Sequence, residues 1–241
     1  MARETETRST IGRVEVRAAA AGSAPVIGGY AAKFGLWSQD LGGFRERVAP
    51  SAFRKTIADG ADVLARVEHQ VLIGRTSSGT LRLLPDDVGL GYEVDVPDTT
   101  VGRDLLVMVG RGDITGSSFA FRTILDEWDL EGEVPLRTLV ETALVDVAPT
   151  HDPAYLDSTA AQVRSLSALT SLSRATGRPV DVLTAAAGAG ELRAALVADA
   201  PTVIDLGAVT RDTPGERSSG PAPATLSVAA ARLRLRLQAQ E

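Results

Sequence analysis

Every aromatic residue of this 241-residue chain, namely two Trp, three Tyr and five Phe, lies at or before Tyr155. Beyond about residue 160 the sequence is rich in Ala, Ser, Thr and Gly. Because aromatic side chains supply much of the apolar surface that a core buries, a packed core is expected only in the first part of the chain. We therefore predict one folded domain at residues 1–165 and a tether and scaffold-like tail, partly disordered, at residues 166–241.

The predicted tail contains two stretches with helical potential. Residues 180–198 carry leucines at helical spacing but are interrupted by Gly188 and Gly190, and residues 211–223 have the composition of a linker. Residues 225–240 alternate Arg with Leu, a period of two that is typical of a strand. Since Ala, Leu, Arg and Gln are strong helix formers, we predict a terminal helix there instead. The tail is expected either to associate with another protein or to be expendable.

Short apolar runs separated by turn residues dominate the first part of the chain. Alternating apolar side chains predict strands at residues 26–34, 44–48, 62–69, 79–84, 90–96, 114–121 and 136–147. Two short helices are expected, one opened by Ala49-Pro50-Ser51 and one after a cap at Asp98 or Thr99. Strands and helices do not alternate regularly, so the predicted fold class is α+β. We expect a compact β-barrel-like core with short flanking helices, followed by a low-complexity Ala-rich tail.

Two further predictions concern the last hairpin. The acidic run at residues 126–129 is expected to form a solvated loop with Trp128 packed at its base, and not a metal site. The last strand is expected to end at Ala148-Pro149, because proline cannot donate a hydrogen bond to a β-ladder.

The residue inventory excludes several kinds of chemistry. With no cysteine the chain has no disulfide, thiol nucleophile or zinc-thiolate site, and with two histidines a histidine-rich metal site is not expected. Only two lysines are present, Lys33 and Lys55, and neither lies in a context that suggests a catalytic amine. Serine and threonine are therefore the usable nucleophiles. We predict no metal and no cofactor.

Charge and hydropathy limit the classes of partner. A formal net charge of -6 argues against nucleic-acid binding, which normally requires a basic surplus. No apolar run approaches the roughly 20 residues that a transmembrane helix needs, and the N-terminus carries no apolar stretch of signal-peptide type. We therefore expect a cytosolic protein with neither a nucleic-acid nor a membrane partner.

Two residues are candidates for a serine hydrolase site. Amide hydrolysis by serine needs a base within hydrogen-bond reach, a group that orients the base, and donors for the oxyanion. His69 is predicted to lie where a strand ends, and Ser118 follows Gly116 and Ser117 at the entry to another strand. A histidine is suited to accept the serine proton at neutral pH. Taken alone, each residue also fits a structural role, such as completing a turn.

Five sequence blocks stand in a characteristic order, at residues 29–34, 43–53, 74–83, 111–121 and 146–149. This order resembles that of the prohead proteases of tailed phages, and the resemblance extends from about residue 10 to about residue 165. Members of that family are serine endopeptidases, related in fold to the herpesvirus assembly protease, that cut scaffolding segments from capsid proteins inside the immature shell. The resemblance therefore implies that residues 1–165 form a serine peptidase domain.

The same resemblance implies a role for each candidate site residue. Ser118 matches the serine of the family's Gly-Met-Ser-Phe-Gly-Phe pattern and would be the nucleophile, with Ser117, which replaces the methionine, as the alternative. His69 would be the general base. Asp146 stands where the family usually has Glu before Val-Ser-Pro, and would orient the imidazole. His151 is the alternative third member, by analogy with the Ser-His-His arrangement of the herpesvirus enzymes.

The function expected from the resemblance is cleavage of the scaffolding segments of capsid proteins during procapsid maturation. The major capsid protein and its scaffolding segment would be the partners, and portal protein, the chain itself and a homo-oligomer are further candidates. The expected location is the host cytoplasm, inside the assembling procapsid. Two alternatives come from other classes: a catalytically silent internal scaffold or assembly chaperone that retains the fold, and a hydrolase of small esters, although the chain lacks Gly-x-Ser-x-Gly.

Overall fold

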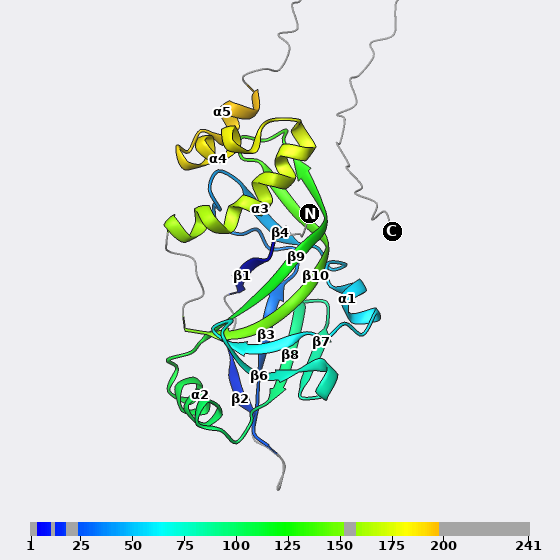
Figure 1. The fold of residues 1–241 in the computed structure, drawn as a ribbon, viewed down its shortest axis with the longest axis vertical. Helices are drawn as coiled ribbons and strands as arrows, with labels where there is room; N and C mark the ends of the chain where they lie inside the picture. The colour runs from blue at the N-terminus through cyan, green and yellow to red at the C-terminus, as the bar shows by residue number, and fades with distance from the viewer. Residues whose placement is uncertain (1–3, 11–12, 18–23, 152–157, 198–241) are drawn as a thin grey trace, which may run out of the picture.

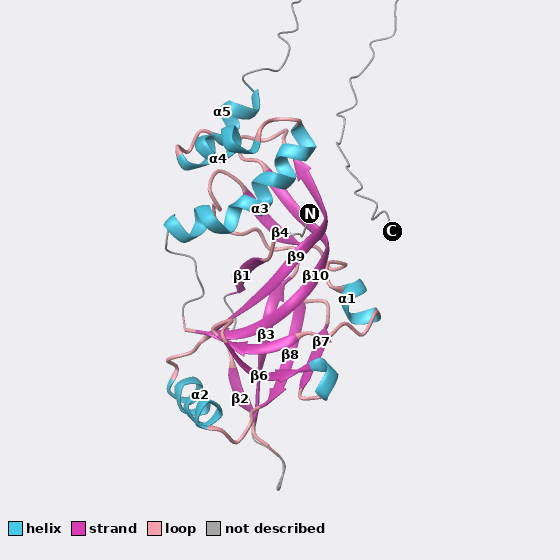
Figure 2. Cartoon of the chain, viewed as in Figure 1, coloured by secondary structure: helices cyan, strands magenta, loops and turns pink. Residues whose placement is uncertain are grey.

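Two β-sheets form the middle of the molecule, and helices lie toward both ends of its long axis (Figure 1, Figure 2). The computed structural model describes residues 4–10, 13–17, 24–151 and 158–197. The six-stranded sheet contains, in spatial order, β1 (Glu6–Thr10), β9 (Gly116–Asp129), β10 (Leu136–Thr150), β5 (Leu64–Val67) and β6 (Val71–Arg75), with β4 (Arg45–Val48) also paired to β10. The four-stranded sheet contains β2 (Glu15–Arg17), β3 (Val26–Lys33), β8 (Gly89–Asp95) and β7 (Leu81–Pro85).

The long hairpin of β9 and β10 organises the larger sheet. β10 pairs antiparallel with β9, parallel with β4 at its beginning, and parallel with β5 near its end. Register shifts interrupt the ladder between β9 and β10 at three places, and such bulges bend and twist a ribbon. The ribbon therefore curves along the molecule (Figure 1), and its two ends have different neighbours.

One apolar cluster joins the two sheets. Ile27, Leu90 and Val94 of the smaller sheet are buried together with residues of β9 and β10. Phe119 stacks on Phe121 with 5.1 Å between ring centroids. The α+β class predicted from the sequence is confirmed. The described strands form two sheets, linked by an isolated bridge between Phe34 and Val48, and do not close into a barrel.

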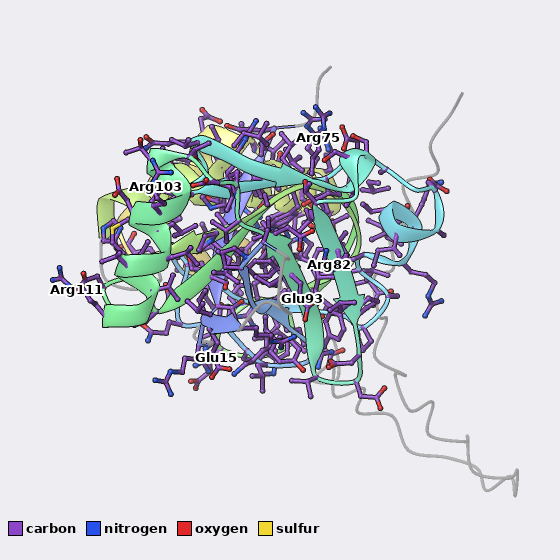
Figure 3. The ribbon with its side chains drawn as sticks, turned by 90° about the horizontal axis from the view of Figure 1, so that it is seen from below. Glu15, Arg75, Arg82, Glu93, Arg103 and Arg111 are labelled. Carbon is purple, nitrogen blue, oxygen red and sulfur yellow. The ribbon has the colours of Figure 1, made fainter. Side chains whose placement is uncertain are left out.

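The other face of the smaller sheet is charged. Arg82 of β7 lies directly opposite Glu93 of β8, and both are seen on these neighbouring strands in Figure 3. Arg82 also donates to Asp95, with Nη2 and Oδ1 2.8 Å apart. The alternate residues Tyr92 and Val94 are buried, so β8 has one face toward the core and one toward water.

The two helices expected from capping signals are present. α1 (Arg54–Ala58) follows Ala49-Pro50-Ser51, and α2 (Thr100–Arg111) begins after Thr99, whose hydroxyl accepts the Gly102 N–H. α2 ends at Gly112, which has φ 82°, a left-handed conformation that glycine adopts without strain. A single 3-10 turn, η1 (Thr76–Ser78), precedes β7.

Three helices of the C-terminal part pack on one end of the β9–β10 ribbon. α3 (Ser158–Thr176), α4 (Val180–Gly188) and α5 (Leu192–Val197) bury leucines around Phe44 and Trp128. The helical potential predicted for residues 180–198 is thus confirmed. The predicted boundary after residue 165 falls within α3 and remains a proposal, and the predicted linker and terminal helix lie outside the described residues. No helix in the described part of the chain is both long and apolar enough to span a membrane.

The structure corrects both predictions for the last hairpin. Residues 126–129 belong to β9 and not to a solvated loop, and Asp126 is buried because Arg137 neutralises its charge. β10 continues through Pro149 to Thr150. Proline lacks only the N–H donor, and the Pro149 carbonyl still accepts the Glu68 N–H, at 3.2 Å, on the side of β5. The predicted strand at residues 62–69, in contrast, ends as β5 at Val67.

A buried guanidinium lies where β1, β4, β9 and β10 meet. The side chain of Arg137 is 0% exposed, and its nitrogens bond Asp126 at 2.6 Å, Glu46 at 2.7 Å and Glu6 at 2.8 Å. Arg8 adds a second positive charge beside Glu6 and Glu46. Burying charges is costly unless each is paired and hydrogen-bonded, and here each has partners on other strands.

Removing Arg137 is expected to destabilise the fold strongly. Arg137→Met fills the site with an apolar side chain of similar length but leaves three buried carboxylates without their main counter-charge. This change should lower the free energy of unfolding by about 3–5 kcal/mol. Urea unfolding of the purified chain measures this. Lys55→Ala, which breaks the exposed pair with Asp59, is the control and should leave the unfolding curve unchanged. Equal stability of Arg137→Met and wild type would contradict the importance of the buried cluster.

Glu6 is expected to make the stability depend on acid pH. Burial alone would raise the pKa of Glu6, but the charges of Arg137 and Arg8, with hydrogen bonds from Arg137 and Thr123, lower it from 4.5 to about 2. A carboxyl whose pKa is lower in the folded state contributes stability that is fully present above its unfolded pKa and is lost as the pH falls through its folded pKa. The unfolding free energy should therefore fall between about pH 4.5 and pH 2. The unfolding free energy of Glu6→Gln should lack this loss in acid. If the unfolding free energies of wild type and Glu6→Gln depend on pH in the same way, the role of Glu6 is rejected.

Candidate active site

A β-turn formed by Val67–Gln70, between β5 and β6, carries His69, whose imidazole contacts a serine. The Gln70 N–H donates to the Val67 carbonyl at 2.9 Å and closes the turn. Its two central residues, Glu68 and His69, have φ values of 53° and 60°. A tight hairpin turn of this kind requires positive φ at both central positions and normally contains Asn or Gly. The prediction that His69 lies just beyond a strand end is confirmed.

The other two predicted site residues lie on the neighbouring strands. Ser118 is near the beginning of β9 and Asp146 near the end of β10, and these strands pair antiparallel with Ala120 opposite Asp146. β5 lies on the other side of β10, where Leu64 is opposite Asp146. The sheet order therefore brings residues 69, 118 and 146 together although they are distant in the sequence.

The three side chains form one series of hydrogen bonds. His69 Nδ1 lies 2.6 Å from Asp146 Oδ1, and His69 Nε2 lies 2.7 Å from Ser118 Oγ. Asp146 is buried, and its second oxygen, Oδ2, accepts a hydrogen bond from Arg66 at 3.1 Å. The His69 side chain is 25% exposed, so the series has its most accessible point at the imidazole.

The partners of the imidazole decide where its proton lies. An ionised carboxylate only accepts hydrogen bonds, so Nδ1 must donate to Asp146. In the neutral ring Nε2 is then the acceptor, and the Ser118 hydroxyl donates to it. This is the arrangement that allows an imidazole to take a proton from a serine.

A second acceptor faces the Ser118 hydroxyl. The carbonyl of Arg8, on β1, lies 2.9 Å from Ser118 Oγ. β1 pairs antiparallel with β9, and Ser9 is opposite Ser118. No local sequence pattern predicts this contact, because it depends on a strand pairing between residues that are about 110 positions apart.

The structure separates Ser118 from its predicted alternative, Ser117. Successive side chains of a strand point to opposite faces, and Ser117 points into the core, where it is 0% exposed. Its Oγ lies 3.1 Å from the Tyr92 hydroxyl. Burial raises the pKa of Tyr92 to about 12, so that hydroxyl stays protonated and can donate. Ser117 has no contact with His69 in the structure.

His151, the predicted alternative to Asp146, lies elsewhere. Its Nδ1 is 2.8 Å from a carboxylate oxygen of Glu68, and its side chain is 68% exposed. Asp146, and not His151, is therefore the group that contacts the His69 ring. Within the described ranges, no group of three or more His, Asp or Glu side chains is arranged to hold a metal ion.

A serine hydroxyl, an imidazole and a buried carboxylate in hydrogen-bonded series are characteristic of serine hydrolases. Residues 12–171 match the family model described as the caudovirus prohead serine protease. The chain therefore belongs to the family of prohead serine proteases, as the sequence blocks predicted. No curated protein and no solved structure matches it.

The proton position on His69 is open to a direct test. In the neutral ring we expect the proton on Nδ1, because Asp146 accepts it, and none on Nε2. Asp146→Ala removes that acceptor and should increase the population protonated on Nε2. Nitrogen-15 NMR of the imidazoles at alkaline pH measures both populations, and His151→Gln assigns the signals. A wild-type ring protonated mainly on Nε2 would contradict the assignment.

Proposed function

We propose that this chain is a serine endopeptidase that matures a phage procapsid by cleaving the scaffolding segment of its capsid protein. The observation that carries the proposal is the hydrogen-bonded series from Asp146 through His69 to Ser118. Membership of the prohead serine protease family supports the class of substrate. The proposed site needs no metal and no cofactor.

In the proposed acylation step, Ser118 Oγ bonds to the carbonyl carbon of the scissile peptide while its proton passes to His69 Nε2. The carbonyl π electrons move to oxygen, and backbone N–H groups are the expected donors to this oxyanion. Asp146 stabilises the imidazolium that forms, and Arg66 holds the second carboxylate oxygen. His69 then gives the proton to the leaving amine as the C–N bond breaks.

Deacylation repeats these roles with water in place of serine. His69 takes a proton from the water as the water oxygen bonds to the acyl carbon. The ester bond to Ser118 then breaks, and His69 returns the proton to Ser118 Oγ. The products are a new carboxyl terminus and the free enzyme. In this scheme Ser118 is the nucleophile, His69 the general base and acid, and Asp146 the group that orients the imidazole.

The proposed partners are the major capsid protein and its scaffolding segment, with the portal protein and the chain itself as further substrates. The proposed location is the interior of the assembling procapsid, in the host cytoplasm. Confinement in a shell raises the effective concentration of enzyme and substrate, so a weak contact is sufficient for cleavage there. Assays should therefore be carried out at high protein concentration.

The proposal is tested by incubating the full chain at high concentration, alone and with the capsid protein encoded in the same genome. Intact mass spectrometry should reveal truncated products with wild type. Ser118→Ala and His69→Ala should each lower the rate of cleavage by roughly 10³-fold or more. Ser77→Ala, at an exposed serine of η1, is the matched control and should cleave at the wild-type rate.

Each other outcome has a definite meaning. Equal cleavage by wild type and Ser118→Ala would reject Ser118 as the nucleophile, and Ser117 would be tested next. If no protein cleaves the capsid subunit, a silent internal scaffold that retains the protease fold becomes the better explanation, because that role survives loss of both residues. Turnover of small esters without cleavage of capsid protein would indicate a different hydrolase.

A further inference from the structure

The turn that carries His69 adopts a backbone conformation that its residues do not favour. Glu68 and His69 both have positive φ, at 53° and 60°, where a side chain with a Cβ is strained. Glu68 is not among the residues that occupy such positions most easily, which are Gly and, less freely, Asn, Asp and His. The conformation therefore requires contacts from outside the turn.

The carboxylate of Glu68 supplies such contacts. Its Oε2 accepts a hydrogen bond from the Thr150 hydroxyl at 2.8 Å, and its Oε1 accepts one from the backbone N–H of His151 at 2.7 Å. His151 Nδ1 lies 2.8 Å from the same Oε1. Thr150 is 4% exposed, so this partner of the Glu68 carboxylate is buried at the end of β10. The Glu68 side chain thus attaches the turn to the last residues of β10.

The attachment matters because β10 also carries Asp146. The Glu68 N–H donates to the Pro149 carbonyl, which extends the parallel pairing of β5 with β10 into the turn. The imidazole of the next residue must meet Asp146 on β10 and Ser118 on β9 at the same time. An error of about 1 Å in such a geometry can reduce a rate by roughly 100-fold.

We infer that Glu68 is a positioning residue for the reaction: by binding the end of β10 it holds the strained turn so that His69 bridges Asp146 and Ser118. This inference rests on the proposed function, since it assigns Glu68 a role in that reaction. Glu68 does not touch the reacting atoms. It acts through the backbone of His69.

Three variants at this position separate positioning from simple folding. Glu68→Gln keeps the attachment, because its carbonyl oxygen can accept from His151 while its amide donates to the Thr150 hydroxyl. Glu68→Ala loses the attachment and keeps the strain. Glu68→Gly also loses the attachment, but glycine fits a φ of 53° without strain, so this variant should be no less stable than Glu68→Ala.

The readout is the labelling of Ser118 by a fluorophosphonate, which reacts with an activated serine and needs no natural substrate. Its maximal rate reports activation of the nucleophile, and its half-saturating concentration reports binding. We expect Glu68→Ala and Glu68→Gly to lower the maximal rate roughly 10- to 100-fold with little change in half-saturation, and Glu68→Gln to stay near wild type. Glu68→Gly at the wild-type rate would overturn the inference, because only the backbone conformation would then matter.

A second measurement does not depend on proteolysis. The His69 Nδ1 proton, held 2.6 Å from Asp146, should give a proton NMR signal far downfield in wild type and Glu68→Gln. The signal should be lost or shifted in Glu68→Ala and Glu68→Gly, with circular dichroism unchanged. If wild type neither labels nor cleaves but this signal responds as expected, the proposed function fails and the positioning of His69 stands. If the signal is the same in all four proteins, the inference is wrong even when the enzyme is active.

Discussion

A guanidinium that is withdrawn from water must find counter-charges inside the protein, and Arg137 finds three of them on three other strands. Glu6, Glu46 and Asp126 come from β1, β4 and β9, so a single side chain of β10 determines which strands can meet at this end of the sheet. With Arg8 the cluster holds two cations and three carboxylates. Hydroxyl groups donate to other oxygens of these carboxylates, as Ser171 does to Asp126 Oδ1 at 2.7 Å. In the described residues, no buried side-chain nitrogen or oxygen lacks a partner.

The same cluster connects the two ends of the folded part to the site. β1 precedes the residues that match the family, and α3 begins within them and ends beyond them. Ser167, in the part of α3 that matches, donates to Glu6 of β1 at 3.0 Å. Arg8 enters the cluster through its side chain and contacts Ser118 through its carbonyl. Electrostatic pairing at the buried cluster therefore fixes the strand that lies beside the proposed nucleophile. One neighbour of Ser118, the Arg8 carbonyl, therefore comes from sequence outside the family match.

What the sequence could predict follows from how local each signal is. The N-terminal cap of α2, the strands β7 and β8, and the strand before His69 depend on neighbouring residues, and all are predicted from the sequence. The convergence of residues 69, 118 and 146 came from the resemblance of ordered blocks, since no local pattern reports a strand order. Asp126 was misassigned because an acidic run normally indicates a solvated loop, and its partner Arg137 lies across a hairpin. The pairing of Glu6 with Arg137 spans 131 positions and leaves no local trace. The turn at Glu68 and His69 was equally hidden, since its residues are not those that such turns prefer.

The Arg8 carbonyl sets a condition on the proposed chemistry. The Ser118 hydroxyl has one proton and two acceptors, His69 Nε2 at 2.7 Å and the Arg8 oxygen at 2.9 Å. Donation to His69 prepares proton transfer, whereas donation to Arg8 requires a protonated imidazole that donates to Oγ. Once Oγ bonds to the acyl carbon it has no proton, so the hydrogen bond to Arg8 can form only before acylation. An interaction that is lost on the way to the transition state stabilises the resting state and raises the barrier. In the proposed chemistry, the pairing of β1 with β9 therefore gives the Ser118 hydroxyl a second acceptor that competes with His69 for its proton.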